Sequence, residues 1–479
     1  MMREMRLRTG MEESSGIQEF EEEYGRQREG TVWSATAHVV TAVIGSGVLA
    51  LAWSVAQLGW LLGPIILSAF AGVTYYTSTL LAECYRAPHP VTGSRNPTYM
   101  NAVRSYLGPK RVFMCGVAQY INLWGTMVGY TITASVSMMA VKRSNCFKKY
   151  GHKTECGASG NQFMIIFGLI ELLLSQLPSL ENITWLSVVA AVMSFGYSSI
   201  GLCLCLAKVV SHGGIRGSLL GVMSGSSGLS SATRTWNVLQ ALGNIAFAYT
   251  FAEVLIEIQD TLKSPPPENE SMKKATMYGI GTTTVFYLSL GCIGYAAFGN
   301  AAPGNILTGF GFYDPFWLVD IANLFIVIHL FGAYQVYAQP IFATLERKMA
   351  VRWPMATFIH TIYSFQVPFM EKSGLLSFTL SKVILRSIFI VFTTLVAMLL
   401  PFFNSVLGLL GAISFWPLTV YFPVSMYMAQ AKITRGHPKW VLLQGLSFVS
   451  LLISIAASVG SVADIVGSLK RAKPFHTQY

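Results

Sequence analysis

The sequence has few charged residues for its length. Of its 479 residues, 11% are charged and 53% are hydrophobic, whereas about a quarter of the residues of an ordinary soluble domain are charged. A chain this poor in charge is not a water-soluble globular enzyme or binding domain. The composition indicates a polytopic membrane protein.

Motifs for several kinds of chemistry are also absent. The sequence has no Cys/His group with zinc spacing and no glycine-rich phosphate loop followed by a lysine. Its serine, histidine and acidic residues form no nucleophile–base set that sequence can place together. The first 31 residues lack the apolar segment of a cleavable signal peptide. We therefore expect no enzyme activity, no metal or cofactor and no ATP-driven pumping.

Eleven apolar stretches are long enough to cross a membrane, since a hydrocarbon core of about 30 Å takes roughly 20 helical residues. They predict an all-α polytopic membrane protein. The stretches lie near 33–55, 60–82, 112–140, 162–180, 185–207, 236–257, 275–298, 315–343, 383–403, 405–428 and 440–466.

The charged segments predict the orientation of these spans. The first 31 residues hold eight acidic residues and are predicted to form a disordered cytosolic tail. With this tail inside, eleven spans place the C-terminus outside, and 22 of the 33 lysines and arginines fall in segments predicted to be cytosolic, as the positive-inside rule requires. The net charge of +11 is spread over short loops, which indicates contact with anionic lipid and no nucleic-acid partner.

Two of the seven cysteines, Cys146 and Cys156, share the loop 141–160, which is predicted to be outside although it carries five basic residues. An oxidising compartment permits a disulfide there, and two unpaired thiols are the alternative. We predict the disulfide.

The first span carries two glycines and a serine at its centre, in "VVTAVIGSGVLALAW". Unwound backbone is tolerated in a membrane only where it lines a cavity or is buried in protein. The amides that begin a half-helix favour an anion such as a carboxylate. These residues, Ile44, Gly45, Ser46 and Gly47, therefore form a candidate binding site. Close helix packing through small residues is the alternative.

A second broken helix would lie five spans further on if the chain were an inverted repeat. That position falls in the span 236–257, which contains Gly243, Asn244, Thr250 and Glu253 among aromatic residues. The segment "FAYTF" contains neither glycine nor proline, so the signal for a second break is weaker.

Long motifs run in order through nearly all of residues 30–475, among them "GTVWSATAHVVTAVIGSGVLALAWSVAQLGW", "ECYRAPHPVTGSRNPTYMNAVRSYLG", "IAFAYTFAEVLIEIQDTLKSPPPENESMKKAT" and "HLFGAYQVYAQPIF". Together they resemble the plant amino-acid permeases of the amino acid/auxin permease family, which shares the leucine-transporter fold. The resemblance implies a five-plus-five inverted repeat with broken helices 1 and 6, plus an eleventh helix. It also implies proton-coupled import of amino acids across the plasma membrane by alternating access, driven by the proton gradient.

On this model the chain divides into five parts. We expect a cytosolic tail (1–31), a first repeat of helices 1–5 (32–208), an external linker (209–235), a second repeat of helices 6–10 (236–430), and helix 11 with an external C-terminus (431–479).

The resemblance also implies where an amino acid binds. The amides from Ile44 to Gly47 would take the carboxylate, and carbonyls near Phe247, Ala248 and Tyr249 would take the ammonium group. Thr250 belongs to the same predicted site.

Three further residues are assigned to the site. Tyr130 on helix 3 would bond the carboxylate or close the site, with core packing as the alternative. Family members usually have Asp in place of Asn244 and a small or apolar residue in place of Glu253. We hypothesise that this shift of a carboxylate alters substrate preference or pH dependence.

Two histidines are candidates for proton coupling because an unperturbed imidazole titrates near pH 6.5. His38 lies seven residues before Gly45, which would place it on the helix face that leads to the break. His329 resembles the histidine of the family motif on helix 8. A neutral ring bonded to one backbone carbonyl is the alternative for each.

Acidic residues within the spans are the other candidates, because their burial in a membrane is costly. Glu257 and Asp260 would form a cytosolic gate with a loop lysine or arginine. Asp320 would be structural, bonded to Asn323 or to an adjacent helix. Glu171 is predicted to lie at the periphery and to reach water.

Other functions remain open. Within the family, auxin influx is the nearest alternative. A receptor that binds amino acids with little transport is another, and a channel would require a continuous polar pore that a broken central helix does not favour.

Overall fold

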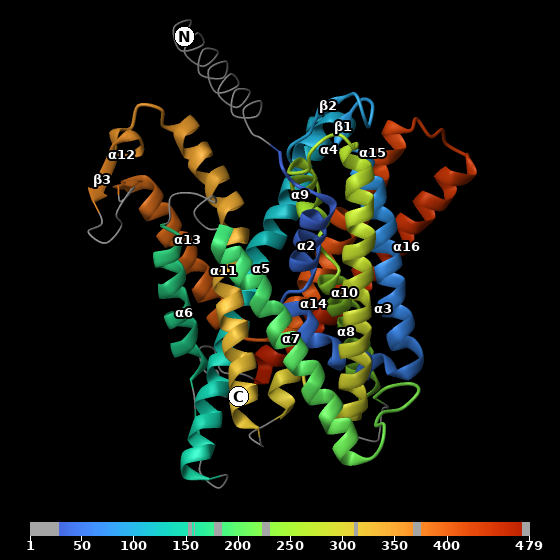
Figure 1. Ribbon diagram of the computed structural model, residues 1–479, viewed down its shortest axis with the longest axis vertical. Helices are drawn as coiled ribbons and strands as arrows, with labels where there is room; N and C mark the ends of the chain where they lie inside the picture. Colours follow the sequence, from blue (N-terminus) through green and yellow to red (C-terminus); the bar gives the residue numbers. More distant parts are fainter. Residues whose placement is uncertain are drawn as a thin grey trace, which may run out of the picture.

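The computed structural model describes residues 28–151, 156–157, 159–176, 184–222, 230–310, 315–366 and 375–471. Most of these residues form long helices that run between two ends of the molecule (Figure 1). In this part of the chain, eight helical segments are long and apolar enough to cross a membrane. Most of the predicted N-terminal tail lies outside the described residues.

The first two predicted spans are joined without a loop. Helix 1 consists of α2 (Val32–Val43), η1 (Ser46–Ala50) and the start of α3 (Leu51–Glu83), and helix 2 is the rest of α3. The chain reverses at Gly59, whose φ of 79° suits glycine. A Cβ there would lie 2.2 Å from the Gly221 nitrogen, so a larger residue would not fit the turn.

The other spans follow in the predicted order. Helices 3 to 11 are α5 (Pro109–Tyr150); α6 (Gly160–Leu174); α7 (Thr184–His212); α8 (Ser231–Ala248) with η3 (Ala252–Val254) and α9 (Leu255–Asp260); α10 (Glu268–Phe298); α11 (Phe316–Arg352); α13 (Leu380–Leu399); α14 (Phe403–Ser414) with the π-helical η6 (Phe415–Tyr421) and α15 (Phe422–Gln430); and α16 (Pro438–Arg471).

Several helices are longer than their apolar stretches. α5 continues to Tyr150 and α11 to Arg352, past the predicted ends at 140 and 343. Lysine and arginine are good helix formers, so these helices extend beyond the apolar region on basic turns. Hydropathy therefore marks the apolar part of each helix and misses its polar ends.

The connections contain regular structure that hydropathy does not predict. The strands β1 (Arg86–Ala87) and β2 (Ser94–Arg95) form a small hairpin before α4 (Tyr99–Leu107). The connection between helices 8 and 9 contains α12 (Thr357–His360) and the antiparallel strands β3 (Ile362–Gln366) and β4 (Leu375–Thr379). Two short turns of helix, η4 (Gly299–Ala301) and η5 (Ile306–Phe310), connect α10 to α11.

The two ends of the bundle can be told apart by these connections. We call the end that carries Arg28, β1, β2 and α12 the inner end, which is uppermost in Figure 1, and the opposite end the outer end. The linker segment 213–222 lies at the outer end, where the amide of Trp60 donates to Ser218 O at 3.2 Å and that of Val222 donates to Ala56 O at 3.1 Å. This part of the linker is therefore bonded to the reversal between helices 1 and 2.

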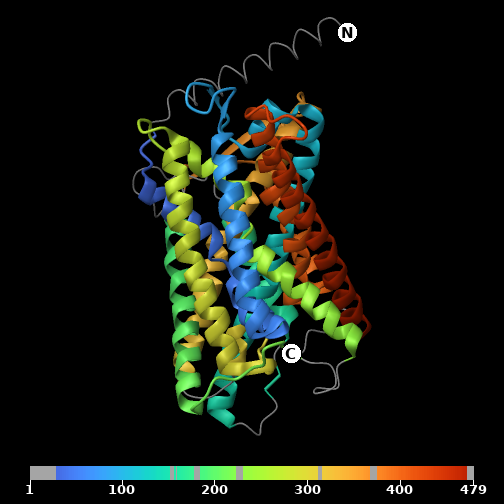
Figure 2. The same cartoon turned by 90° about the vertical axis from the view of Figure 1, so that its right-hand side faces the viewer.

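Helices five positions apart pack against each other. α3 contacts α10, and α5 contacts α11, so helices 2 and 7, and helices 3 and 8, are paired as expected for two related halves. α16 lies along the outside of the bundle against α8 and α14, as Figure 2 shows.

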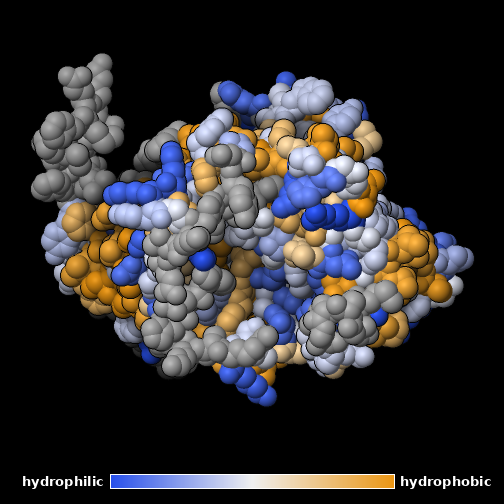
Figure 3. All heavy atoms as spheres, turned by 90° about the horizontal axis from the view of Figure 1, so that it is seen from below, coloured by the Kyte–Doolittle hydropathy of each residue, from blue (hydrophilic) through white to orange (hydrophobic). Residues whose placement is uncertain are grey.

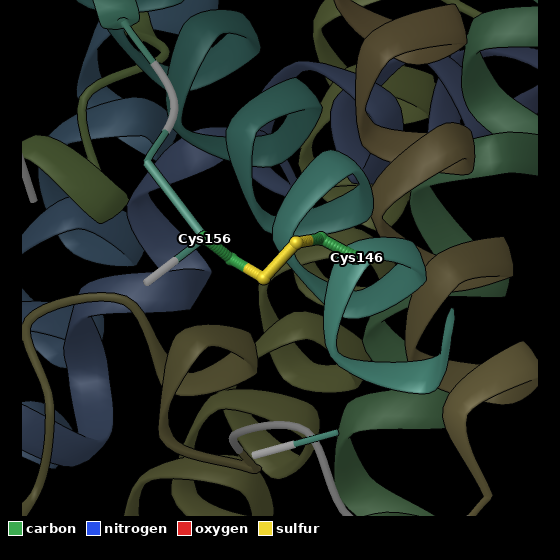
Figure 4. Close-up of a disulfide and its surroundings, with 2 residues drawn as sticks. All are labelled: Cys146 and Cys156. Atoms are coloured by element: carbon green, nitrogen blue, oxygen red, sulfur yellow. A yellow bond between two sulfur atoms is a disulfide. The ribbon is translucent and has the colours of Figure 1, made fainter. Parts of the chain in front are cut away.

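The outer end of α5 is joined to the following segment by a disulfide. Cys146 and Cys156, the expected pair, are bonded with their Cα atoms 6.0 Å apart (Figure 4). The five other cysteines are unpaired.

The crossing of α8 and α14 depends on glycines whose backbones nearly touch. A Cβ at Gly243 would lie 2.2 Å from Gly408 O, and one at Gly411 would lie 2.0 Å from Gly243 O. Neither contact is compatible with a side chain, so the small residues allow two membrane helices to approach closely.

We expect Gly243→Ala to destabilise the protein because the added methyl group collides with backbone that cannot rotate away. Overpacking of this kind costs about 1–3 kcal/mol. The measurement is the thermal unfolding of detergent-purified protein, with Gly281→Ala as the control, because a Cβ at Gly281 meets nothing within 4 Å. Equal unfolding temperatures for the two variants would contradict the close crossing.

Candidate functional site

Helix 1 is interrupted at the predicted glycine–serine–glycine segment. Ile44 (φ −78°, ψ 84°) and Gly45 (φ −121°, ψ −153°) are non-helical between α2 and η1. Their amides donate to the last turn of α2, at 2.8 and 2.9 Å. The amides of Ser46 and Gly47 donate to no acceptor among the described residues. Of the four predicted amides, two are therefore left to bind a ligand.

Helix 6 is interrupted at the corresponding position, although "FAYTF" lacks glycine and proline. α8 ends at Ala248, and Phe251 (φ −132°, ψ −3°) precedes η3. The amide of Thr250 donates to Phe247 O at 3.1 Å, and its hydroxyl donates to Ala246 O at 2.8 Å. The Thr250 hydroxyl and an i to i−3 bond in the last turn of α8 thus satisfy carbonyl groups that the break would otherwise leave without a hydrogen-bond donor.

The two breaks meet at a small buried cavity. Its volume is about 20 Å³, enough for about one water molecule, so the site is closed in this structure. Its walls come from helices 1, 3, 6 and 8, and comprise Ala42, Val43, Gly45, Ser46, Gly47, Asn122, Thr126, Tyr130, Phe247, Ala248, Thr250 and Tyr337.

Polar groups at this cavity lack partners. The hydroxyls of Ser46 and Thr126 are buried and bond to nothing in the described part of the chain, and the two free amides of helix 1 lie beside them. Buried polar groups are nearly always hydrogen-bonded in proteins. These unsatisfied donors make the cavity a candidate site for an acceptor-rich group.

Two tyrosines that were not predicted as site residues bond backbone carbonyls at the breaks. The Tyr287 hydroxyl on α10 lies 2.5 Å from Val43 O and 3.2 Å from Ala248 O, so one side chain spans both breaks. The Tyr197 hydroxyl on α7 donates to Gly45 O at 3.0 Å. The only available signal was that a tyrosine buried in mid-span needs a partner for its hydroxyl.

Comparison with known proteins identifies the family. The model of a family described as "transmembrane amino acid transporter protein" matches residues 28–466. The chain is 52% identical to amino acid permease 3 of Arabidopsis thaliana, over 99% of this chain and 98% of that protein. It is 54% identical to amino acid permease 4 of the same plant, over 96% and 98%. The chain belongs to the transmembrane amino acid transporter family.

A solved structure supports the fold of this transporter. Mhp1, a nucleobase-cation-symport-1 family transporter in a closed conformation with bromovinylhydantoin bound, matches with a TM-score of 0.51 and 12% identity, over 94% of this chain and 95% of that one. The predicted fold is confirmed: an all-α membrane protein with a five-plus-five repeat, broken helices 1 and 6, and an additional eleventh helix.

Not every residue assigned to the site reaches the cavity. Asn244 packs against α14, where a Cβ on Gly408 would lie 3.0 Å from its Oδ1. Tyr249 faces away, with its ring 5.3 Å from that of Tyr287. Glu253 lies one layer behind the cavity wall, bonded to Asn122. The break follows Ala248 and redirects the side chains of Tyr249 and Glu253, whereas Asn244 lies within regular α8 and faces the neighbouring α14. Linear spacing gives none of these directions.

His38 does not face the break, and the expected placement is wrong. Its side chain is exposed, whereas Ala35, Val39 and Val43 form the buried face of α2. The argument from helical spacing fails because regular helix ends at Val43, before Gly45 is reached.

His329 is buried near the break but does not line the cavity. Its Nδ1 lies 2.7 Å from Ala190 O, to which it donates, and its Nε2 has no partner among the described residues. The ring lies 5.8 Å from that of Tyr197, whose hydroxyl bonds Gly45 O. The bond to a carbonyl is the one expected for a neutral ring, and a coupling role stays a prediction.

The inner ends of the two broken helices are tied together. Arg28 Nη2 lies 3.0 Å from Asp260 Oδ1, and Arg28 Nε donates to Asp260 O at 2.8 Å. The Tyr85 hydroxyl donates to Asp260 Oδ1 at 2.5 Å. Burial and this bond raise the pKa of Tyr85, so it remains a donor. The backbones of Gly30 and Thr261 are also bonded, at 3.0 Å. We call this group the inner gate.

Glu257 has a different partner from the one predicted. Its Oε1 accepts the amide of Tyr99 at 3.1 Å, which is the first residue of α4, and it forms no ion pair within the described residues. A carboxylate at a helix N-terminus is stabilised by the unpaired amides there. Glu257 therefore anchors α4 to helix 6 at the inner end.

Two other acidic residues lie outside the site. Asp320 Oδ2 accepts a long bond of 3.5 Å from Asn145 of α5, so its partner is on an adjacent helix, not Asn323. Glu171 was expected to reach water, but it is fully buried and accepts a bond of 2.6 Å from Gln335 of α11. The expectation failed because hydropathy of one helix does not show which neighbour covers it.

A larger cavity opens at the outer end. Its volume is about 410 Å³, and it is bounded by the end of α5, by η5 and its preceding residues, and by the start of α14. Figure 3 shows this end with hydrophilic residues around a hollow near the middle. Polar members of the lining are Arg143, Ser144, Asn305, Thr308, Asn404 and Ser405.

The two glycines of helix 1 are expected to differ in tolerance. A Cβ at Gly47 would lie 3.1 Å from Ala248 Cα and from a Phe247 ring atom, whereas one at Gly45 would lie 3.7 Å from the Tyr130 hydroxyl. We expect Gly47→Ala to lower uptake about tenfold at equal surface expression, which corresponds to 1.4 kcal/mol, and Gly45→Ala to change it less than about twofold. Equal uptake by the two variants would show that the breaks need not touch.

The inner gate is expected to limit access from the inner end. We expect Asp260→Asn to increase labelling of a cysteine placed at Ala42, on the cavity wall, by an impermeant thiol reagent applied to that side. A loss of 1–2 kcal/mol gives about a five- to 30-fold change. Glu270→Gln, an exposed carboxylate nearby, is the control, and the exchange Arg28→Asp with Asp260→Arg should restore slow labelling. Unchanged labelling in Asp260→Asn would contradict the gate.

Proposed function

We propose that this protein is a proton-coupled symporter that imports amino acids across the plasma membrane by alternating access. The observation that carries the proposal is the cavity between the two breaks, with unsatisfied amides at Ser46 and Gly47 on one side and the C-terminal end of α8 on the other. Amides at the start of a helical segment favour an anion, and the carbonyl end of a helix favours a cation. The pair is complementary to a zwitterion.

The two charged groups of an amino acid have separate places in this proposal. The carboxylate would accept bonds from the amides of Ser46 and Gly47 and from the Ser46 hydroxyl. The ammonium group would donate to the carbonyls of Phe247 and Ala248. The Ala248 carbonyl accepts one bond, from the Tyr287 hydroxyl, and has a second lone pair to offer. Tyr130 and Tyr337, whose rings meet at 5.6 Å, would close over the substrate.

The relatives support amino acids as the substrate class. They are named amino acid permeases, and a more distant relative, 29% identical over 91% of this chain, is named lysine histidine transporter-like 6 of Arabidopsis thaliana.

Alternating access would proceed between the two ends of the bundle. In this structure the inner gate is closed by Arg28 and Asp260, and the larger cavity lies at the outer end. Import would require closure of the outer cavity and separation of Arg28 from Asp260. The proton gradient would supply the energy, so the cycle needs no cofactor. In this orientation the inner end and the N-terminus are cytosolic and the C-terminus is extracellular.

The test is electrophysiology of the expressed protein together with uptake in a cell deficient in amino-acid transport. We expect amino acids to evoke a saturable inward current that grows as the external pH falls. A competition panel of neutral, basic and acidic amino acids and an indole acid at two pH values gives the substrate class. Binding without flux would instead indicate a receptor. Preference for the indole acid would indicate an auxin carrier, and a current that does not saturate would indicate a channel.

A further inference from the structure

Glu253 is a buried acidic side chain directly behind the cavity. It belongs to η3, which follows the helix 6 break, and its exposed fraction is 2%. Oε1 accepts a bond from Asn122 Nδ2 at 2.7 Å, and Oε2 has no partner in the part of the chain that the structure describes. Across the described ranges, no lysine, arginine or histidine forms an ion pair with this carboxyl group.

Burial without a cation affects the charge that the Glu253 carboxyl group can carry. An ionised carboxylate that is buried without a cation is costly, and within a membrane the cost is high. The neutral acid is therefore favoured while the site is closed. Ionisation becomes favourable when water or a cation reaches Oε2, so the protonation state of Glu253 depends on which conformation the protein adopts.

Asn122 connects this group to the substrate cavity. Its side chain lines the cavity, and its Oδ1 accepts a bond from Ser414 at 2.6 Å. The backbone carbonyl of Glu253 also accepts a bond from Gln119 at 3.2 Å. Helices 3, 6 and 10 are thus linked through Asn122 and Glu253. A change in the charge of the carboxyl group acts directly on Asn122, which lines the cavity.

The ionisable groups around Glu253 are few. Tyr99 of α4, Cys115 and Tyr130 of α5, and Tyr337 of α11 lie near enough to interact with its charge, and all four are neutral side chains near pH 7. The one acidic neighbour is Glu257 of α9, which is bonded to the amide of Tyr99. In the described residues, α3 and η6 add no ionisable group to these interactions.

We propose that Glu253 is the residue that binds and releases the transported proton. This role for Glu253 rests on the proposed function of proton-coupled import. A proton from the outer side forms an O–H bond on Oε2 when the site loads. When α9 moves and the inner gate opens, water reaches the acid, the O–H bond breaks and the proton passes to that water. The negative charge that remains strengthens the bond that Oε1 accepts from Asn122 Nδ2, so the side chain of Asn122 is drawn toward Glu253 and away from the bound molecule.

Glu171 provides a matched control. It too is fully buried and accepts one side-chain amide bond, from Gln335, and its other oxygen bonds to no described residue. However, neither Glu171 nor Gln335 lines the cavity. The two carboxyl groups therefore differ mainly in their connection to the substrate site.

The experiment compares Glu253→Gln, which retains an acceptor for Asn122, with Glu171→Gln and the unaltered protein. We expect Glu253→Gln to lose the dependence of current on external pH and to reduce gradient-driven accumulation at least about tenfold, the equivalent of 1.4 kcal/mol, while exchange of labelled for unlabelled substrate at equal pH persists. Glu171→Gln should accumulate substrate like the unaltered protein.

A pH-dependent current in Glu253→Gln equal to that of the unaltered protein would overturn the proposal. So would an equal loss of coupling in Glu171→Gln. If the unaltered protein itself showed no proton-dependent current, the proposed function would fail instead. If Glu253→Gln does not reach the surface, Glu253→Asp decides: its carboxyl is one methylene shorter, so the external pH for half-maximal current should shift, and an unchanged profile would refute the role.

Discussion

A membrane interior contains no water to bond a bare amide or carbonyl, and this protein interrupts two of its helices there. The structure depends on how those backbone groups are satisfied. Tyr287 donates to carbonyls of both breaks, and Tyr197 donates to Gly45 O. Helices 5 and 7 must therefore lie close to helices 1 and 6. The amides of Ser46 and Gly47 find no acceptor in the described part of the chain, so the same constraint that organises the bundle also leaves donors free at the proposed binding site.

Close approach of backbones is the second requirement. The breaks contact each other through Gly47 and Ala248, and α8 crosses α14 through Gly243, Gly408 and Gly411. Such contacts gain packing energy without help from the hydrophobic effect, which does not drive helices together in lipid. They also leave the space between the breaks small, at about 20 Å³, so a substrate can enter only if helices move apart.

The charged groups are divided between the surface and the interior. At the inner end, Arg86 pairs with Glu268 at 2.7 Å and Lys273 pairs with Glu83, and these ion pairs join the ends of helices 2 and 7. Near the middle of the bundle, by contrast, Glu171 and Glu253 have only neutral amide partners. The ion pairs at the inner end fix the ends of helices, even where the carboxylate is buried, as in Glu268. A buried carboxyl group without a cation can instead change its charge when its surroundings change.

The amino-acid sequence alone is enough to predict the class of protein, the order of its spans and the position of the first break. These features are local: apolar length decides whether a segment suits a membrane, and glycine with serine at mid-span weakens a helix wherever it packs. The break in helix 6 was only weakly indicated, because it is stabilised by Thr250 and by Tyr287 from another helix. Tertiary structure alone decided that His38 is exposed, that Asn244 faces α14 and that Glu253 bonds Asn122. Which face of a helix meets a neighbour depends on how the helices pack, and the direction of a side chain beyond a break, such as Glu253, depends also on the angle of the break.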